Sequence, residues 1–286
     1  MRAAPLLLLL ACTSGPNDSN DPADPADTGP VDTGLLPGEV VLGQTCPLAD
    51  SIGTIGLQPS NGSAWISGQL YDRPNPWYGE PTLTTATCAF HTFDANSCGT
   101  CPSGDVCGQA GECTKQPRAL TDVHVELTRD GATVSFDADP TGGYLYGDAA
   151  GPDTSAYALT ATFAGQSITL PELRLADPTL AVVVRTEGGY DAPGALDATW
   201  TPPTDGGLLT TTIPINHHAG GPTFTRCEAP ASAGAFHADA AMVDPLALIT
   251  GLEFQGVDHV NVAAAQTALG CVDVRFGGTT AWVWEP

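Results

Sequence analysis

The sequence predicts a mainly β protein: one or more antiparallel β-sandwiches with a disulfide-rich loop insert and a disordered N-terminal tether. From residue 41 onward, short runs alternate apolar and polar residues with period two, as Val123, Val125 and Leu127 do. Clusters of Gly, Pro, Asp and Thr separate these runs about every 8–15 residues. Helical periodicity is weak, and Pro245 limits any helix in the best stretch, residues 239–248, to about one turn.

Eleven runs carry the strand pattern most clearly. In chain order they are residues 64–71, 122–127, 134–136, 157–163, 180–185, 196–200, 209–215, 223–227, 257–262, 271–276 and 280–284. Residues 41–286 exceed the roughly 100 residues of one immunoglobulin-type sandwich. The pattern therefore allows one large sandwich with insertions or two packed lobes. Because no linker-like stretch follows residue 41, we favour a single β-rich unit.

The N-terminus predicts export. Met1 and Arg2 precede an apolar run that is far shorter than the roughly 20 residues of a membrane-spanning helix. The run ends Leu-Leu-Ala-Cys at Cys12, which resembles the lipobox of bacterial lipoproteins. The resemblance implies that residues 1–11 are a signal peptide, cleaved after Ala11, and that Cys12 carries a diacylglycerol. The alternative is an ordinary signal peptide that leaves Cys12 as an unpaired thiol.

Residues 12–40 are interpreted as a lipidated, disordered, acidic linker. After Cys12 this stretch contains Asp, Pro and Gly repeats and no Lys or Arg. It cannot bury enough apolar surface to offset the entropy of ordering. Calcium binding by the Asp repeats is the alternative, but the spacing lacks the glycine-turned ligand loop of calcium sites.

The charge balance excludes several partners. Thirty-two acidic residues oppose nine basic ones, for a net charge of −23. Nucleic-acid binding needs a basic footprint, and so does docking on anionic lipid. The acidic surface indicates solubility, and we expect no nucleic-acid partner.

Eight cysteines remain after Cys12, and an even set downstream of an export signal predicts disulfides. They are Cys46, Cys88, Cys98, Cys101, Cys107, Cys113, Cys227 and Cys271. Cys227 and Cys271 stand alone in the C-terminal part, so we expect them to pair. The other six allow several connectivities, and those in residues 88–115 are expected to form a cystine-rich insert. A zinc site with four cysteine ligands is the alternative, although only Cys98 and Cys101 form a Cys-x-x-Cys knuckle.

No catalytic or cofactor motif is present. The sequence has no G-x-S-x-G elbow, no H-E-x-x-H pair and no phosphate-binding loop. We therefore predict no catalytic residue, no metal site and no cofactor. A metal-dependent hydrolase built on His217, His218 and His237 is the competing hypothesis.

The other polar residues that could bind a ligand are expected to be ordinary solvent-exposed residues. His124 and His259 alternate with apolar neighbours and are expected on the solvent face of strands. Asp137 and Asp139 form a D-x-D near a strand end, which we interpret as a solvated acidic loop, with a calcium site as the alternative.

The tryptophans raise one further choice, between core and binding surface. Trp282 and Trp284 share one face of the last expected strand, with Val283 on the other. We expect them in the core, because large aromatics supply much of the buried area of β proteins. If they were exposed instead, they would suggest stacking on sugars.

The order of features resembles that of uncharacterised lipoproteins encoded by gliding Gram-negative bacteria. The features are the lipobox, the Asp-rich tether, an early strand, Cys101-Pro-Ser-Gly-x-x-Cys107, the segment Ala-Thr-Trp-Thr-Pro at 198–202, and Cys227 in a late strand. The resemblance implies a compartment and a fold, and no chemistry.

These observations predict a lipid-anchored, non-enzymatic envelope or cell-surface protein with an interaction or structural role. It would be exported and anchored to the outer membrane, facing either the periplasm or the exterior, with an unidentified protein or glycan partner. A carbohydrate-binding module is the first alternative, and the metal-dependent hydrolase is the second.

Overall fold

The computed structural model describes residues 36–60, 63–94, 96–149, 156–177, 179–189, 191–215, 222–247 and 251–285. All of them belong to one compact unit, Val31–Pro286. The expected signal peptide, Cys12 and most of the acidic linker lie outside these ranges. Within them, no helix has the length and apolarity of a membrane span.

Strands dominate the described residues, which confirms the predicted fold class. In chain order they are β1 (Val40–Leu42), β2 (Ser51–Ser60), β3 (Ser63–Leu70), β4 (Leu83–Thr84), β5 (Cys88–His91), β6 (Asp105–Cys107), β7 (Cys113–Lys115), β8 (His124–Arg129), β9 (Ala132–Asp137), β10 (Tyr144–Asp148), β11 (Ala156–Phe163), β12 (Gln166–Arg174), β13 (Ala181–Thr186), β14 (Leu196–Trp200), β15 (Leu208–Pro214), β16 (Phe224–Pro230), β17 (Ala235–Ala238), β18 (Asp258–Gln266), β19 (Cys271–Thr279) and β20 (Ala281–Glu285).

The helices are single turns. They are η1 (Leu48–Asp50), η2 (Ala231–Ala233), α1 (Ala240–Val243) and η3 (Asp244–Leu246). Pro245 lies in the first turn of η3, directly after α1. The expectation that this proline would limit the helix to about one turn is confirmed.

The strands form one large sheet and three smaller ones. The large sheet has the order β10-β3-β2-β19-β18-β15-β16-β5-β4, and β1 pairs with β18 beside this path. The smaller sheets are β12-β11-β8-β9, β17-β14-β13-β20 and the hairpin β6-β7. Most neighbours are antiparallel as predicted, but β19 pairs with β2 and β13 pairs with β20 in parallel.

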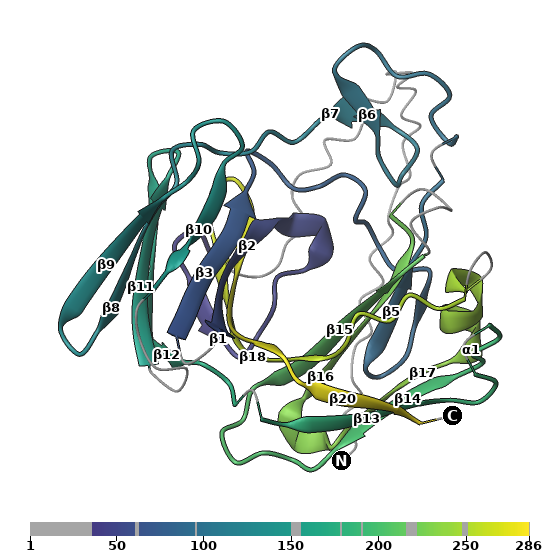
Figure 1. Ribbon diagram of the computed structural model, residues 1–286. Helices are drawn as coiled ribbons and strands as arrows, with labels where there is room; N and C mark the ends of the chain where they lie inside the picture. The colour runs from purple at the N-terminus through teal and green to yellow at the C-terminus, as the bar shows by residue number, and fades with distance from the viewer. Residues whose placement is uncertain are drawn as a thin grey trace, which may run out of the picture. The chain divides into compact units, whose positions relative to one another are not determined.

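Two hydrophobic cores lie against the same large sheet. The first contains Ile55 of β2 and Val274 of β19, packed with Leu159 of β11. The second contains Ile213 of β15, packed with Val184 of β13. Figure 1 shows the sheet of β8, β9, β11 and β12 and the sheet of β13, β14, β17 and β20 at different parts of the large sheet. The described residues therefore form two sandwiches that share one sheet.

Side-chain alternation leaves a second face on the large sheet. In β3, Ala64 and Ile66 enter the first core, and Trp65 and Ser67 consequently point the opposite way. We call this opposite side of β10, β3, β2 and β19 the free face. Residues 43–50 cover part of it beside β19, where the backbone N–H of Cys46 donates to the buried Asp273 at 2.8 Å.

The disulfides correct one prediction. Cys227 bonds to Cys88 and Cys271 bonds to Cys46, so the expected Cys227–Cys271 bond is wrong. The reason is the strand order: β15 and β18 lie between β16, which holds Cys227, and β19, which begins at Cys271. Cys227 instead faces Cys88 directly across the β16–β5 pair, with their Cα atoms 4.0 Å apart.

The cystine-rich insert is shorter than residues 88–115. Cys98 bonds to Cys107 and Cys101 bonds to Cys113, and both bridges lie within the segment that forms the β6–β7 hairpin. Cys88 belongs to β5 of the large sheet and not to the insert.

Candidate functional site

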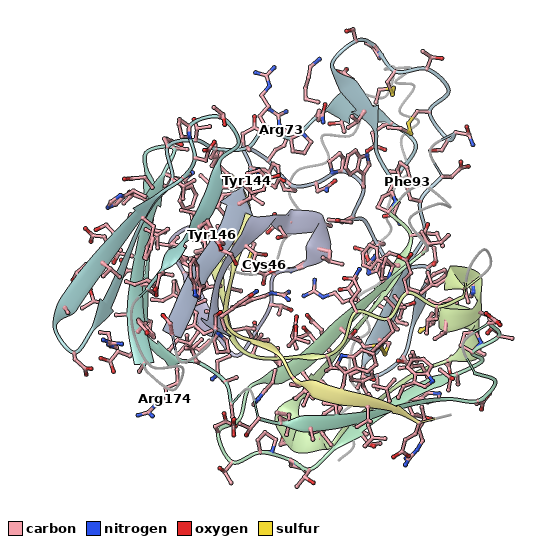
Figure 2. All side chains as sticks on the ribbon, in the orientation of Figure 1. Cys46, Arg73, Phe93, Tyr144, Tyr146 and Arg174 are labelled. Carbon is pink, nitrogen blue, oxygen red and sulfur yellow. A yellow bond between two sulfur atoms is a disulfide. The ribbon has the colours of Figure 1, made fainter. Side chains whose placement is uncertain are left out.

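Three aromatic side chains gather on the free face at the edge strand β10. Leu145 points into the first core, so its neighbours Tyr144 and Tyr146 point outward and are 62% and 73% exposed. The ring centroid of Trp65, on the adjacent strand β3, lies 5.1 Å from that of Tyr146. We call Trp65, Tyr144 and Tyr146 the aromatic platform; Figure 2 labels the two tyrosines on β10. Trp65 itself is half-buried, so the exposed part of the platform is the two tyrosines. Clustered exposed aromatic surface of this kind marks a binding site more often than scattered apolar residues do.

Hydrogen bonds fix polar groups around the platform. Tyr71 donates its hydroxyl to Oε1 of Gln69 at 2.6 Å, while Nε2 of Gln69 donates to the carbonyl of Gly142 at 2.5 Å. At the other end of β10, the hydroxyl of Ser63 donates to Asp148 at 2.5 Å. The platform is thus framed by polar side chains that are held in place before any ligand arrives.

A pocket of about 190 Å³ adjoins the platform on the same face. It is lined by Thr54, Gln58, Ser67, Asp258, Val260, Arg275 and glycines of β2, β3 and β19. We call this pocket the trough. Trp65 is the register partner of Gln58, and Tyr146 is the register partner of Ser67, so two platform residues lie next to residues that line the trough.

Arg275 lines the trough and makes no hydrogen bond to a described residue. Its side chain is 24% exposed, and its buried Nε has no partner among the described residues. The nearest carboxylate is that of Asp273, 3.8 Å from Nη2, which is too far for a hydrogen bond. Burial lowers the pKa of Arg275 and raises the pKa of Asp273. Polar groups buried without partners are costly and call for an explanation.

A second cavity, of about 480 Å³, lies over β5 and β16. Two of its charged groups pair with each other: Nε of Arg226 donates to Glu228 at 2.8 Å. The hydroxyl of Thr45 donates to the same carboxylate at 2.9 Å. His91 stacks on Phe224 with ring centroids 4.8 Å apart, and burial lowers the pKa of its imidazole. The arginine that lines this cavity is therefore already hydrogen-bonded to a carboxylate, whereas Nε of Arg275 in the trough has no partner among the described residues.

The expectation of a core position for both C-terminal tryptophans is wrong for Trp282. That residue is 38% exposed, because β20 is the edge strand of its sheet. Trp284 is half-buried and packs against the second core. Phe254 contacts both indoles edge-on, and these three rings line a hollow of about 530 Å³.

The histidines do not gather into a metal site in the part of the chain that the structure describes. His237 lies between two carboxylates, 2.7 Å from Asp197 and 3.1 Å from Asp239. His217 and His218 lie outside the described residues, so the three-histidine hypothesis gains no support here.

The two histidines expected on solvent faces differ. His124 is partly exposed beside Asp137, at 2.7 Å. His259 is fully buried, so the expectation is wrong for it. Its ring nitrogens lie 3.1 Å and 2.8 Å from the carbonyl oxygens of Asp177 and Gly206. The cause is that the segments around Asp177 and Gly206 cover the ring on this face of β18.

The remaining metal candidates have local partners. Asp139 accepts from the backbone N–H groups of Thr141 and Gly142, both at 2.8 Å, which closes a turn after β9. The sulfurs of Cys98, Cys101 and Cys113 lie within 4.8 Å of one another, as a zinc site would require, but each is in a disulfide.

Sequence reasoning did not single out the platform or the trough. Tyr144 and Tyr146 alternate with Leu145 directly after a Gly-Gly pair, which is a strand signal for an edge hairpin. That signal predicts that both tyrosines share a face. It does not predict that Trp65 joins them, because the β10–β3 pairing joins segments far apart in the chain.

Comparisons with known proteins supply no identity. No family model and no curated protein matches the sequence. Among solved structures, the crystal structure of chicken CNTN1 FN1-FN3 domains aligns over 83% of this chain and 67% of that one. The TM-score is 0.23 and the identity 10%, so this alignment carries no argument about fold or function.

Proposed function

We propose that this chain is a lipid-anchored, non-enzymatic envelope protein that binds a glycan on the free face of its large sheet. The observation that carries the proposal is the aromatic platform, with its two exposed tyrosines, near a trough lined by polar side chains. The C–H face of a sugar ring packs on an aromatic ring, while its hydroxyl groups need hydrogen-bond partners at the ring edge. Trp65 and Tyr146 supply the first, and Gln58 and Ser67 supply the second.

A rigid support favours this role. The platform residues alternate with Leu145, Ala64 and Ile66, which are buried in the first core. A site on packed strands loses little entropy on binding, because the backbone under it is already ordered. The acidic tether and the lipid expected on Cys12 would hold this face near a membrane without docking it there.

The experiment is binding of the full-length protein to an array of plant, bacterial and host glycans, followed by calorimetry on the hits. Tyr146→Ala should weaken binding by tenfold or more, since an aromatic anchor typically contributes more than 1 kcal/mol. The melting temperature should not change, because the side chain is exposed.

Trp282→Ala is the matched control, because it removes an exposed aromatic ring from the separate hollow beside Phe254. It should leave glycan affinity unchanged. Loss of binding in Trp282→Ala with full binding in Tyr146→Ala would move the site to that hollow. If the wild-type protein bound no glycan on the array, the proposed function would be rejected.

A further inference from the structure

We propose that the trough selects sugars that carry a carboxylate, with the guanidinium of Arg275 as the group that receives it. This inference rests on the proposed glycan-binding function and names the chemical class of its ligand. The platform would hold the sugar ring, and the acid group would point across the sheet toward β19.

The first support is the unmet hydrogen-bonding capacity of Arg275. A guanidinium offers five N–H donors in a planar fork. None of them makes a hydrogen bond to a described residue, and Asp273 lies at 3.8 Å while it accepts the backbone N–H of Cys46. A carboxylate matches the fork with two parallel charge-assisted bonds, whereas a hydroxyl offers a single neutral acceptor.

The second support is the register of four neighbouring strands. Tyr146 pairs with Ser67, Ser67 with Gly56, and Gly56 with Arg275. These residues form one row on the free face, with an aromatic ring at one end and a cation at the other. Strands lie about 4.8 Å apart, so the two ends of the row are about 14 Å apart at the backbone.

The third support is the empty middle of that row. A Cβ on Gly56 would lie 3.5 Å from the nearest atoms of Ser67, which is ordinary contact, and its backbone is not in the left-handed region. The backbone therefore has room for a β-carbon at this position. A glycine here leaves the space between the platform and Arg275 open to a ligand.

The charges around the trough determine how strongly it should prefer an acidic sugar over a neutral one. Asp258 also lines the trough, and it accepts the hydroxyl of Thr279 at 2.8 Å. Its carboxylate would repel an acidic ligand at short range. The net charge of −23 acts more weakly, because distant charges are screened beyond about 8 Å at physiological salt.

The experiment compares short oligomers of galacturonate, guluronate and glucuronate with their carboxyl-reduced, neutral counterparts, using the full-length protein and calorimetry. The wild type should bind at least one acid about tenfold more tightly than its neutral counterpart. Arg275→Gln should reduce the ratio of the affinity for the acid to the affinity for its neutral counterpart to nearly one. Asp258→Asn should increase it several-fold, a gain that a purely structural role for these residues would not produce.

Three further variants keep the result interpretable. Arg174→Gln removes an exposed arginine that projects away from β12, and it should keep the full preference (Figure 2). Gly56→Val should block acidic and neutral oligomers alike. Should Arg275→Gln fail to fold, Asp273→Asn/Arg275→Gln removes both members of the buried pair and leaves its net charge unchanged.

The outcomes separate the two proposals. Equal affinity for acidic and neutral oligomers, lost in Tyr146→Ala, would overturn the carboxylate inference and leave glycan binding in place. A preference for acids that survives in a folded Arg275 variant would also overturn the inference. Failure of every oligomer and every arrayed glycan to bind would reject both.

Discussion

Tyr146 and Arg275 occupy the two ends of one register row that crosses β10, β3, β2 and β19. They are separated by 129 positions in the sequence, yet the order of the sheet places them on the same face. Between them lie only the small residues Ser67 and Gly56. The row gives the free face an aromatic end, an open middle and a cationic end, and the functional proposals depend on this arrangement.

Gly277 is required by the close approach of β18 to β19. Its φ is +149°, and a Cβ there would lie 2.1 Å from the carbonyl oxygen of His259. Gly277→Ala should lower the free energy of unfolding by about 1–3 kcal/mol, measured by denaturant titration. Gly278→Ala is the neighbouring control, because its nearest contact is an ordinary 3.4 Å from Pro59. Equal losses in the two variants would contradict the strand geometry.

Peptide mapping under non-reducing conditions should recover Cys46 linked to Cys271 and Cys88 linked to Cys227. The Cys46–Cys271 bridge spans 225 positions, so removing it by double alanine substitution should cost about 5 kcal/mol in the chain-entropy model. Removing Cys98–Cys107, which spans nine positions, should cost about 3 kcal/mol or less. A recovered Cys227–Cys271 peptide would show that the order of the large sheet is wrong.

The histidines should titrate in a fixed order in NMR spectra. Burial lowers the pKa of His91 below its ordinary value of 6.5, whereas the carboxylates of Asp197 and Asp137 raise the pKa values of His237 and His124 above it. The contribution of His91 to stability is therefore lost as the pH falls below 6.5. The contributions of His237 and His124 to stability are present below pH 6.5 and are lost as the pH rises through their raised pKa values. A His91 that titrates after His237 as the pH is raised would refute the burial of its ring.

The lipid expected on Cys12 can be tested without the folded domain. Cys12→Ser should move the protein from the membrane fraction to the extract, and it should abolish incorporation of a labelled fatty acid. Release without any change in labelling, or membrane retention of the variant, would contradict the lipoprotein resemblance.

Local features of the fold were predictable from the sequence, and the pairing of distant segments was not. Period-two alternation located strands such as β11 and β14, and Pro245 correctly limited the helix near α1. The large-sheet order was not predictable, because long-range strand pairing leaves no local pattern. The error over Cys227 follows from that missing order. The misplacement of His259 follows from ring contacts with Asp177 and Gly206, which are distant in the chain.

The candidate site was predictable only in its parts. An exposed Tyr-x-Tyr on an edge strand can be anticipated from alternation, and Trp65 stands out as a tryptophan in a strand pattern. In the sequence, Arg275 has the pattern of an ordinary polar strand residue next to Val274, whose side chain is buried on the other face. Its role becomes visible only when β2 and β3 place Gly56 and Ser67 beside it.

The most direct test of the glycan-binding face is NMR mapping with isotope-labelled protein and an oligosaccharide that binds on the array. The largest shift changes should fall on Trp65, Ser67, Tyr146 and Gly56, with Arg275 added when the sugar carries a carboxylate. Resonances of Phe254, Trp282 and Trp284 should stay in place. Changes confined to those three residues, or spread over the β6–β7 insert, would contradict the assignment of function to the free face.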